Sequence, residues 1–406
     1  MLKEFDLDSF IKEHITGRPS SIVSKDLINF DRKIKEKLEN RSVMVIGAAG
    51  TIGSSFIKSV LKYPIKRLFA FDINENGLTE LVRDLRSLKG YKLPSVIKTY
   101  PIDFGNSIFY KIFDNEGPFE IIANFAAHKH VRSEKDHYSI EAMLENNVIK
   151  AKKLLDRLTS SPPEHFFCVS TDKAANPVNV MGATKKLMED MILSYSSKLP
   201  ITTARFANVA FSNGSLLFGF MERLMKKQPL SSPIDIKRYF LSPKESGELC
   251  MLACLLGKSG EIIFPKMDYE VDMMSFSSIG IKLLEEMGYV PHICESEKEA
   301  REFIANSSPR SSRYPIYLFE SDTSGEKPFE EFYTEDEIVD KSKFSSIGVI
   351  RQRSHRKTSE IDRVITGLSS IFNKPDANNE MIISQLSDYL PTFNYIDKGK
   401  NLDQRM

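Results

Sequence analysis

A glycine-rich loop near the start of the chain constrains the fold more than any other feature. The apolar run VMVI leads into GAAGTIG, in which Gly47, Gly50 and Gly53 recur at every third position, and an amphipathic stretch follows. A second apolar run, RLFAFDI, comes next. This order predicts a βαβ unit, because glycine permits the tight turn and lets backbone amides approach a phosphate group at a helix N-terminus.

The alternation of apolar runs and helical segments continues along the chain. Short apolar runs occur in SVIKTYPI, FEIIANFAA, HFFCVS and ITTARFANV, separated by segments of helical period. Continuous apolar strands between helices are typical of a parallel sheet that is covered on both faces, so the predicted class is a doubly wound α/β fold. The predicted parts are a helical arm at 1–40, a dinucleotide-binding domain at 41–230, a substrate-binding region at 231–345 with one strand near 260–267 returning to the main sheet, and a helical extension at 346–406.

Asp72 ends the second predicted strand, where a carboxylate can accept both hydroxyl hydrogens of an adenosine ribose. The same carboxylate repels a 2′-phosphate, so the sequence favours NAD over NADP. Asp103, after the third strand, is placed to reach the adenine edge or to cap the next helix, and the two roles are compatible. The predicted cofactor-binding residues of this Rossmann-type unit are Gly47, Gly50, Thr51, Ile52, Gly53, Asp72, Asp103, Ala126 and Lys185.

Composition narrows the class of partner. The 406 residues include 56 basic and 55 acidic side chains, a balance that selects neither nucleic acid nor an anionic membrane. Four cysteines without a C-x-x-C pair suit a reducing compartment, and no segment reads as a signal peptide or a membrane span. We expect a cytoplasmic protein with a small-molecule substrate. We expect no metal, because His128 and His130 diverge at this spacing and no carboxylate cluster accompanies them.

The stretch STDKAANPVNVMGATKK, residues 170–186, follows the fifth predicted strand onto the sheet edge that would carry the cofactor. Thr171, Asp172 and Lys173 emerge beside the nicotinamide position and are therefore candidate catalytic residues. Met181 begins the next helix, and Lys185 lies one turn further on the same face. An ammonium beside a carboxylate stabilises both charges unless burial competes, so the Asp-Lys pair can supply an acid and a base.

This pattern resembles the extended short-chain dehydrogenase/reductases, whose glycine loop is followed by a Ser/Thr and by Tyr-x-x-x-Lys on the helix after the fifth strand. The stretch STDKAANPVNVMGATK is more specifically similar to the UDP-N-acetylglucosamine 4,6-dehydratases and related CapD-like polysaccharide-biosynthesis proteins. The resemblance covers roughly residues 42–335. It includes the segments DINENGLTELVRDLRS, AAHKHV, ARFANV, IKRYFLSPKES, GEIIFPKM and SGEKPFEE.

The resemblance implies a reaction in which the sugar is oxidised at C4, loses water across C5 and C6, and regains the hydride at C6. Met181 stands where most short-chain enzymes have the tyrosine base, and part of the dehydratase family shares this methionine and uses other groups to move protons. Lys185 would orient the nicotinamide ribose and Thr171 would hydrogen-bond the C4 oxygen, whose proton leaves through water or Asp172. Lys173 would remove the C5 proton, and protonated Asp172 would donate to the departing C6 hydroxyl.

Further positions match the family near the sugar nucleotide. Arg205 either binds substrate or forms a buried structural pair, and Arg238 either binds the diphosphate or forms a surface ion pair. Asn147 matches an asparagine that stabilises the active-site helix and lysine in this superfamily. The predicted substrate-binding residues are Lys129, His130, Arg205, Asn208, Arg238 and Tyr239.

The predicted function is an NAD-dependent nucleotide-sugar 4,6-dehydratase, acting on UDP-N-acetylglucosamine for surface polysaccharide or glycan biosynthesis, in a homo-oligomer. An NDP-sugar 4-epimerase or 4-ketoreductase would use the same cofactor cradle. Epimerases need a phenolic base and lack the Asp-Lys pair, so Met181 and the pair Asp172-Lys173 argue against that alternative. An NAD-binding scaffold without catalysis is the alternative outside the enzymes.

Overall fold

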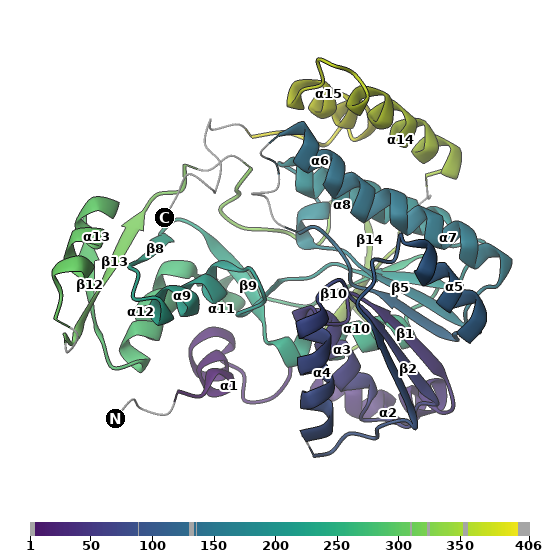
Figure 1. Ribbon diagram of the computed structural model, residues 1–406, viewed down its shortest axis with the longest axis horizontal. Coiled ribbons are helices and arrows are strands. Elements are labelled where there is room, and N and C mark those ends of the chain that lie inside the picture. The colour runs from purple at the N-terminus through teal and green to yellow at the C-terminus, as the bar shows by residue number, and fades with distance from the viewer. Residues whose placement is uncertain are drawn as a thin grey trace.

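The computed structural model describes residues 5–87, 89–129, 134, 136–308, 311–322, 325–351 and 356–396. Its larger lobe is built on a central sheet and its smaller lobe lies beside that sheet (Figure 1). The strands of the central sheet are β1 (Ser42–Ile46), β2 (Arg67–Phe71), β3 (Val96–Tyr100), β4 (Ile121–Asn124), β5 (His165–Val169), β6 (Ile201–Ala204), β10 (Glu261–Pro265), β14 (Ile338–Asp340) and β15 (Ile347–Arg351).

Within the described residues these strands lie in the order β14-β15-β10-β6-β5-β4-β1-β2-β3. The strands from β10 to β3 pair in parallel, whereas β15 and β14 add antiparallel strands at the β10 edge. β1 is buried along its whole length, as expected for a strand covered on both faces. The doubly wound α/β fold predicted from the sequence is confirmed.

Helices cover both faces of the central sheet (Figure 1). One face carries α2 (Ser24–Leu38), α3 (Thr51–Val60), α4 (Glu75–Ser87) and α10 (Pro243–Leu256), whose apolar side chains share a core with the sheet. The other face carries α5 (Ser107–Glu116), α6 (His137–Leu144), η3 (Glu145–Ile149), α7 (Lys150–Ser160), α8 (Val180–Ser194), α14 (Thr358–Phe372) and α15 (Asn379–Tyr389). The helical pair near the C-terminus therefore belongs to this second core.

The smaller lobe has a core of its own, which includes Phe220, Phe240 and Ile316. In the described residues its strands form two three-stranded sheets, β11-β9-β7 and β12-β13-β8. Its elements are α1 (Leu7–Phe10), η1 (Ile11–Thr16), β7 (Asn208–Val209), α9 (Leu216–Met225), β8 (Leu230–Pro233), β9 (Lys237–Leu241), α11 (Tyr269–Asp272), β11 (Met273–Ser275), α12 (Phe276–Glu286), β12 (Val290–Cys294), α13 (Glu297–Asn306) and β13 (Arg313–Phe319).

The N-terminal segment joins the two lobes. α1 and η1 pack on the smaller lobe through Phe10, Ile11 and Ile15, whereas α2 packs on the core of the larger lobe. Between them, the Arg18 guanidinium lies 2.9 Å from Glu245 of α10 and 3.1 Å from Asp272 of α11. These two partly buried ion pairs connect the N-terminal segment to α10 of the larger lobe and to α11 of the smaller lobe.

The pattern of the sequence does not predict β14 and β15. β15 lies at the start of the segment expected to be a helical extension, yet its residues 347–350 are buried in the central sheet. β15 has only five residues, which is too short to give a clear periodic pattern in the sequence. Its antiparallel pairing with β10 therefore becomes evident only in the structure. None of the described helices has the length and apolar character needed to cross a lipid bilayer.

Close packing of α10 on α3 depends on Gly247. A Cβ added there would lie 2.2 Å from the Ser55 carbonyl carbon and oxygen, which are backbone atoms that cannot rotate away. We therefore expect Gly247→Ala to lower the free energy of unfolding by about 1–3 kcal/mol in denaturant titrations. Gly367→Ala in α14 is the matched control, because its Cβ would first meet the flexible Gln385 side chain at 2.8 Å. Equal effects of the two substitutions would contradict this packing argument.

Candidate active site

A cavity of about 760 Å³ opens at the carboxyl edge of the central sheet, between that sheet and the smaller lobe. The ends of β4, β5 and β6 supply one wall, through residues such as Phe125, Thr171 and Phe206. Elements of the smaller lobe supply the opposite wall, including Leu216 of α9 and Arg238 of β9. Parallel strands that end at one edge bring side chains from distant parts of the chain into a single site.

The glycine loop lies along this edge, and two of its three glycines leave no room for a Cβ. Gly47 has φ of +75°, and a Cβ there would lie 2.6 Å from the Ala126 amide nitrogen. A Cβ on Gly53 would lie 2.1 Å from the Gly47 carbonyl oxygen. α3 begins at Thr51 with Gly50 as its N-cap, so no N-cap side chain accepts a hydrogen bond from its first amides. This arrangement fits a dinucleotide pyrophosphate.

Asp72 follows β2 and closes over the glycine loop. Its carboxylate oxygens accept hydrogen bonds of 2.9 Å from the Ala49 and Asn74 amides, which fix the side chain beside the loop. Asp103 forms a 2.7 Å ion pair with Lys150 of α7, and it also accepts a hydrogen bond from the Gly105 amide. Asn106, not Asp103, caps α5. Asp103 therefore does not cap α5, which was one of the two roles considered for it from the sequence.

Thr171, Asp172 and Lys173 form a connected group directly after β5, where η4 (Asp172–Ala174) begins. The Thr171 hydroxyl donates to Asp172 Oδ1 at 2.8 Å, and Lys173 Nζ lies 3.1 Å from the same oxygen. Thr171 and Lys173 line the cavity, while Asp172 is buried behind them. Burial lowers the pKa of Lys173, but the carboxylates of Asp172 and Glu330 outweigh it and raise the pKa above its usual range.

α8 contributes the side chains of Met181 and Lys185 to the same cavity. Met181 is buried, and its amide donates to the Glu134 carboxylate at 2.8 Å. Burial lowers the pKa of Lys185 to about 8, assisted by the neighbouring Lys129. Among the described residues, Lys185 Nζ contacts the Met188 sulfur at 3.7 Å and makes no ion pair with a carboxylate. An ammonium without an anionic partner fits a bound ribose or another oxygen-rich ligand.

The substrate positions predicted from the sequence separate into two groups. Lys129, Asn208 and Arg238 line the cavity, and burial lowers the pKa of Lys129. Tyr239 alternates with Arg238 along β9, so it points away from the cavity and packs against Phe332 with ring centroids 5.2 Å apart. His130 lies outside the described residues.

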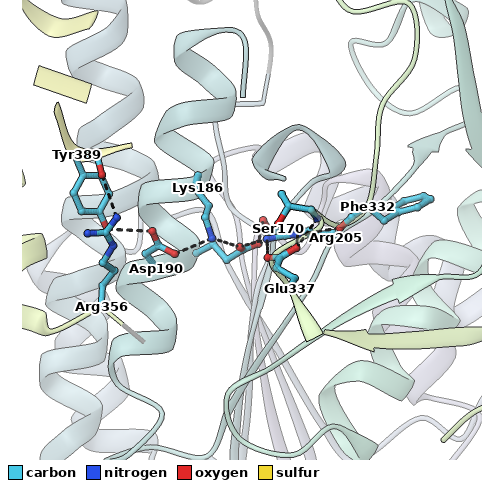
Figure 2. A network of polar contacts seen from close by, with 10 residues as sticks. Ser170, Lys186, Asp190, Arg205, Phe332, Glu337, Arg356 and Tyr389 are labelled. Atoms are coloured by element: carbon cyan, nitrogen blue, oxygen red, sulfur yellow. Dashed lines mark hydrogen bonds and ion pairs between the residues drawn. The ribbon is translucent and has the colours of Figure 1, made fainter. Parts of the chain in front are cut away.

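Arg205 does not line the cavity but belongs to a buried polar network (Figure 2). Its guanidinium binds Glu189 at 2.6 and 3.0 Å and Glu337 at 2.7 Å through both terminal nitrogens. Burial alone would raise the pKa of Glu189, but Arg205 and Lys186 lower it to about 2. Of the two roles considered for Arg205 from the sequence, these contacts correspond to the buried structural pair.

The network connects the site to the helices near the C-terminus. Glu189 accepts a 3.0 Å hydrogen bond from the Ser170 hydroxyl, directly before Thr171. On the same helix, Lys186 bridges Glu189 and Asp190, and the Tyr389 hydroxyl of α15 donates to Asp190 at 3.1 Å (Figure 2). The helix that carries Met181 and Lys185 is thus held between β5 and α15.

One residue of the site, Glu330, was not predicted, and another, Asn147, was named for a different role. Glu330 is buried, and its Oε1 lies 3.5 Å from Lys173 Nζ and 3.7 Å from Arg238 Nη2. It lies in the segment SGEKPFEE, which carried part of the resemblance, but nothing local marks one of its acidic residues as buried. Asn147 of η3 pairs with the His128 backbone, accepting at 2.8 Å and donating at 2.9 Å, and so holds the strand-end loop rather than the lysine.

The family model described as polysaccharide biosynthesis protein matches residues 43–352. The chain belongs to this family. The family predicted from the sequence is therefore confirmed. The matched residues include most of the central sheet and most of the smaller lobe. All the residues that line the cavity lie within the matched range.

The protein is similar to several known chains. Uncharacterized membrane protein MJ1061 of Methanocaldococcus jannaschii is 31% identical over 320 residues, covering 77% of this chain and 86% of that protein. Capsular polysaccharide biosynthesis protein CapD of Staphylococcus aureus is 26% identical, covering 87% of this chain but 55% of CapD. The crystal structure of Pen from Bacillus thuringiensis has a TM-score of 0.62 at 19% identity, covering 82% of this chain and 98% of Pen. The last likeness shows a shared fold.

The buried pair of Arg205 generates a stability prediction. Arg205→Met removes the cation that Glu189 and Glu337 share and leaves Glu189 with Lys186 alone. We therefore expect the free energy of unfolding to fall by about 3–5 kcal/mol in urea titrations. Lys298→Met is the control, because Lys298 is 85% exposed and lies 3.8 Å from Glu302 at the surface. The control should cost less than about 1 kcal/mol. A loss for Arg205→Met no larger than the control's would contradict the structural role of Arg205.

Proposed function

We propose that the protein is an NAD-dependent nucleotide-sugar 4,6-dehydratase that acts on UDP-N-acetylglucosamine. One observation carries this proposal: Lys173 lines the cavity and is in contact with the Asp172 carboxylate directly behind it, and Met181 leaves no phenol at this site to act as the base. Water elimination next to a ketone needs one group to remove a proton and another to donate one. The Asp-Lys pair meets both needs, whereas an epimerase needs only one acid-base group at C4.

Support for the cofactor comes from the cradle itself. Gly47 and Gly53 leave no room for a Cβ in the loop, Asp72 is fixed beside it, and the buried Lys185 lacks an anionic partner among the described residues. When bound, NAD would accept the hydride from C4 and supply it to C6. Asp72 would hold the adenosine ribose and disfavour a 2′-phosphate, and Lys185 would hydrogen-bond the nicotinamide ribose.

The contacts of Thr171 suggest how the C4 hydroxyl loses its proton without a tyrosine. Thr171 donates its own hydroxyl hydrogen to Asp172 at 2.8 Å, so it can pass that proton inward while it accepts one from the substrate. Asp172 is then protonated, which is the state that it needs to donate to the C6 hydroxyl. The proton taken from the C4 hydroxyl thus leaves in the water that departs from C6.

Lys173 completes the proposed cycle. The C4 ketone acidifies the C5 hydrogen, and neutral Lys173 removes that proton while Asp172 protonates the leaving hydroxyl. After the hydride reaches C6, Lys173 returns a proton to C5. The atoms balance, because the substrate loses one water and gains nothing from solution. Asp172 and Lys173 return to their starting charges, so the site is ready for another turnover.

Arg238 and Lys129 are proposed to bind the anionic part of the substrate. Both line the cavity, and an arginine fork suits a diphosphate. Asn208, beside them on β7, is proposed to contact the sugar. Arg205 and Tyr239 are left out of this proposal because their side chains are directed elsewhere.

The proposal predicts that the purified protein converts UDP-N-acetylglucosamine to a product lighter by one water in mass spectrometry. Lys173→Met should lower the rate of dehydration by about 100-fold to 10,000-fold, because the base for C5 is lost, and a 4-keto sugar that keeps its C6 hydroxyl should accumulate. The control is Lys237→Met on the exposed side of β9, which should leave the rate unchanged.

Other outcomes identify the alternatives. A product of unchanged mass would indicate a 4-epimerase, and a reduced product would indicate a 4-ketoreductase. Cofactor binding without turnover over a panel of nucleotide sugars would indicate a scaffold. Near-normal dehydration by the Lys173→Met variant would remove Lys173 from its assigned role.

A further inference from the structure

The Lys173 ammonium lies between two carboxylates that come from distant parts of the chain. Asp172 Oδ1 is 3.1 Å from Nζ, and Glu330 Oε1 is 3.5 Å from it. Both carboxylate side chains are almost fully buried, with 3% and 4% of their surface exposed, whereas the Lys173 side chain keeps 19% exposed. The lysine therefore faces the cavity, and the two carboxylates lie behind it in a region of low dielectric constant.

The proposed mechanism gives these carboxylates different tasks. Asp172 accepts a hydrogen bond from Thr171 and receives the proton of the C4 hydroxyl. Once Asp172 is protonated, it can neither stabilise the Lys173 ammonium as an anion nor accept a proton from it. Glu330 is then the remaining carboxylate in contact with Lys173 among the described residues.

We propose that Glu330 is a positioning residue that controls the charge of Lys173, holding the ammonium in the resting site and accepting its proton when Lys173 becomes the base. This proposal rests on the proposed dehydratase function. In the step, one N–H bond of Lys173 breaks and an O–H bond forms on Glu330, while the electron pair stays on nitrogen. That pair then takes the C5 proton. Reversal of the two transfers restores the ion pair, so no further reactant is needed.

The surroundings of Glu330 support a proton-accepting role. Burial raises its pKa, and the negative charge of Asp172 raises it further, while Lys173, Arg238 and Lys327 act in the opposite direction. The charged groups that face Lys173 are Asp172 of η4, Glu330 and Arg238 of β9. Two anions and two cations thus share one buried site, and a proton can move from Lys173 to Glu330 without changing the net charge.

A purely structural role for Glu330, that of holding Arg238, is less consistent with the contacts. Arg238 Nη1 already donates to the carbonyl oxygens of Lys237 and Lys327 at 2.9 Å and of Pro328 at 3.2 Å. Its contact with Glu330 is longer, at 3.7 Å. Arg238 therefore has its position fixed by backbone groups, and the shorter contact of Glu330 is with Lys173.

The test measures the amine of Lys173 directly, without substrate. The full-length Glu330→Gln variant is labelled with trace acetic anhydride at pH 9, and acetylation of Lys173 is quantified by mass spectrometry against the wild-type protein. Only the neutral amine reacts, and an opposite charge in contact shifts a pKa by about 1–3 units, so we expect the reactivity of Lys173 to rise about tenfold or more. Glu331→Gln is the matched control, because Glu331 is exposed and lies 4.0 Å from Lys327. It should leave the reactivity unchanged.

Kinetics provide the second readout. Glu330→Gln should lower kcat for dehydration with little change in KM, because the amide cannot accept the proton, and Glu330→Asp should restore part of kcat. Lys173 reactivity equal to that of the wild type in Glu330→Gln would overturn the proposal, as would an unchanged kcat. Absence of dehydration in the wild-type protein would instead refute the proposed function, while the labelling result would still decide whether Glu330 controls the charge of Lys173.

Discussion

Parallel strands that end at one edge of the central sheet determine where the candidate active site forms. β1, β4, β5 and β6 run in the same direction, so the loops that follow them lie along one edge of the sheet, and those after β4, β5 and β6 line the cavity. This brings the glycine loop, Thr171 to Lys173 and Asn208 together although they are far apart in sequence. The smaller lobe then closes the cavity from the other side and contributes Arg238.

Charge burial explains how this edge is kept in place. Arg205, fully buried, compensates Glu189 and Glu337, and Glu189 also accepts from Ser170 at the end of β5. A buried ion pair adds little net stability over an apolar cluster of the same size, but loss of one partner is costly. The network therefore favours one arrangement of β5, α8 and the segment around residue 337. The network continues through Asp190 to Tyr389, and this hydrogen bond connects α15 to α8.

Local patterns in the sequence were sufficient to predict the parallel sheet, the glycine loop and the stretch from Thr171 to Lys185, because each follows from neighbouring residues. Three features depend on partners that no local pattern identifies. Arg205 binds Glu337, which lies 132 positions along the chain, and Glu330 meets Lys173 from the segment between β13 and β14. The direction of Tyr239 depends on which side of β9 faces the cavity. Arg238 and Phe240 occupy that side, so Tyr239 is excluded.

In the proposed reaction an amine and a carboxyl group, instead of a phenol, transfer the protons while hydride moves from C4 to C6 of one sugar. The most direct test uses UDP-N-acetylglucosamine that carries deuterium at C4. We expect a product that has lost one water and carries the deuterium on its C6 methyl group. Deuterium that stays at C4 in a product of unchanged mass, or that is absent from the C6 methyl group, would contradict the proposed reaction.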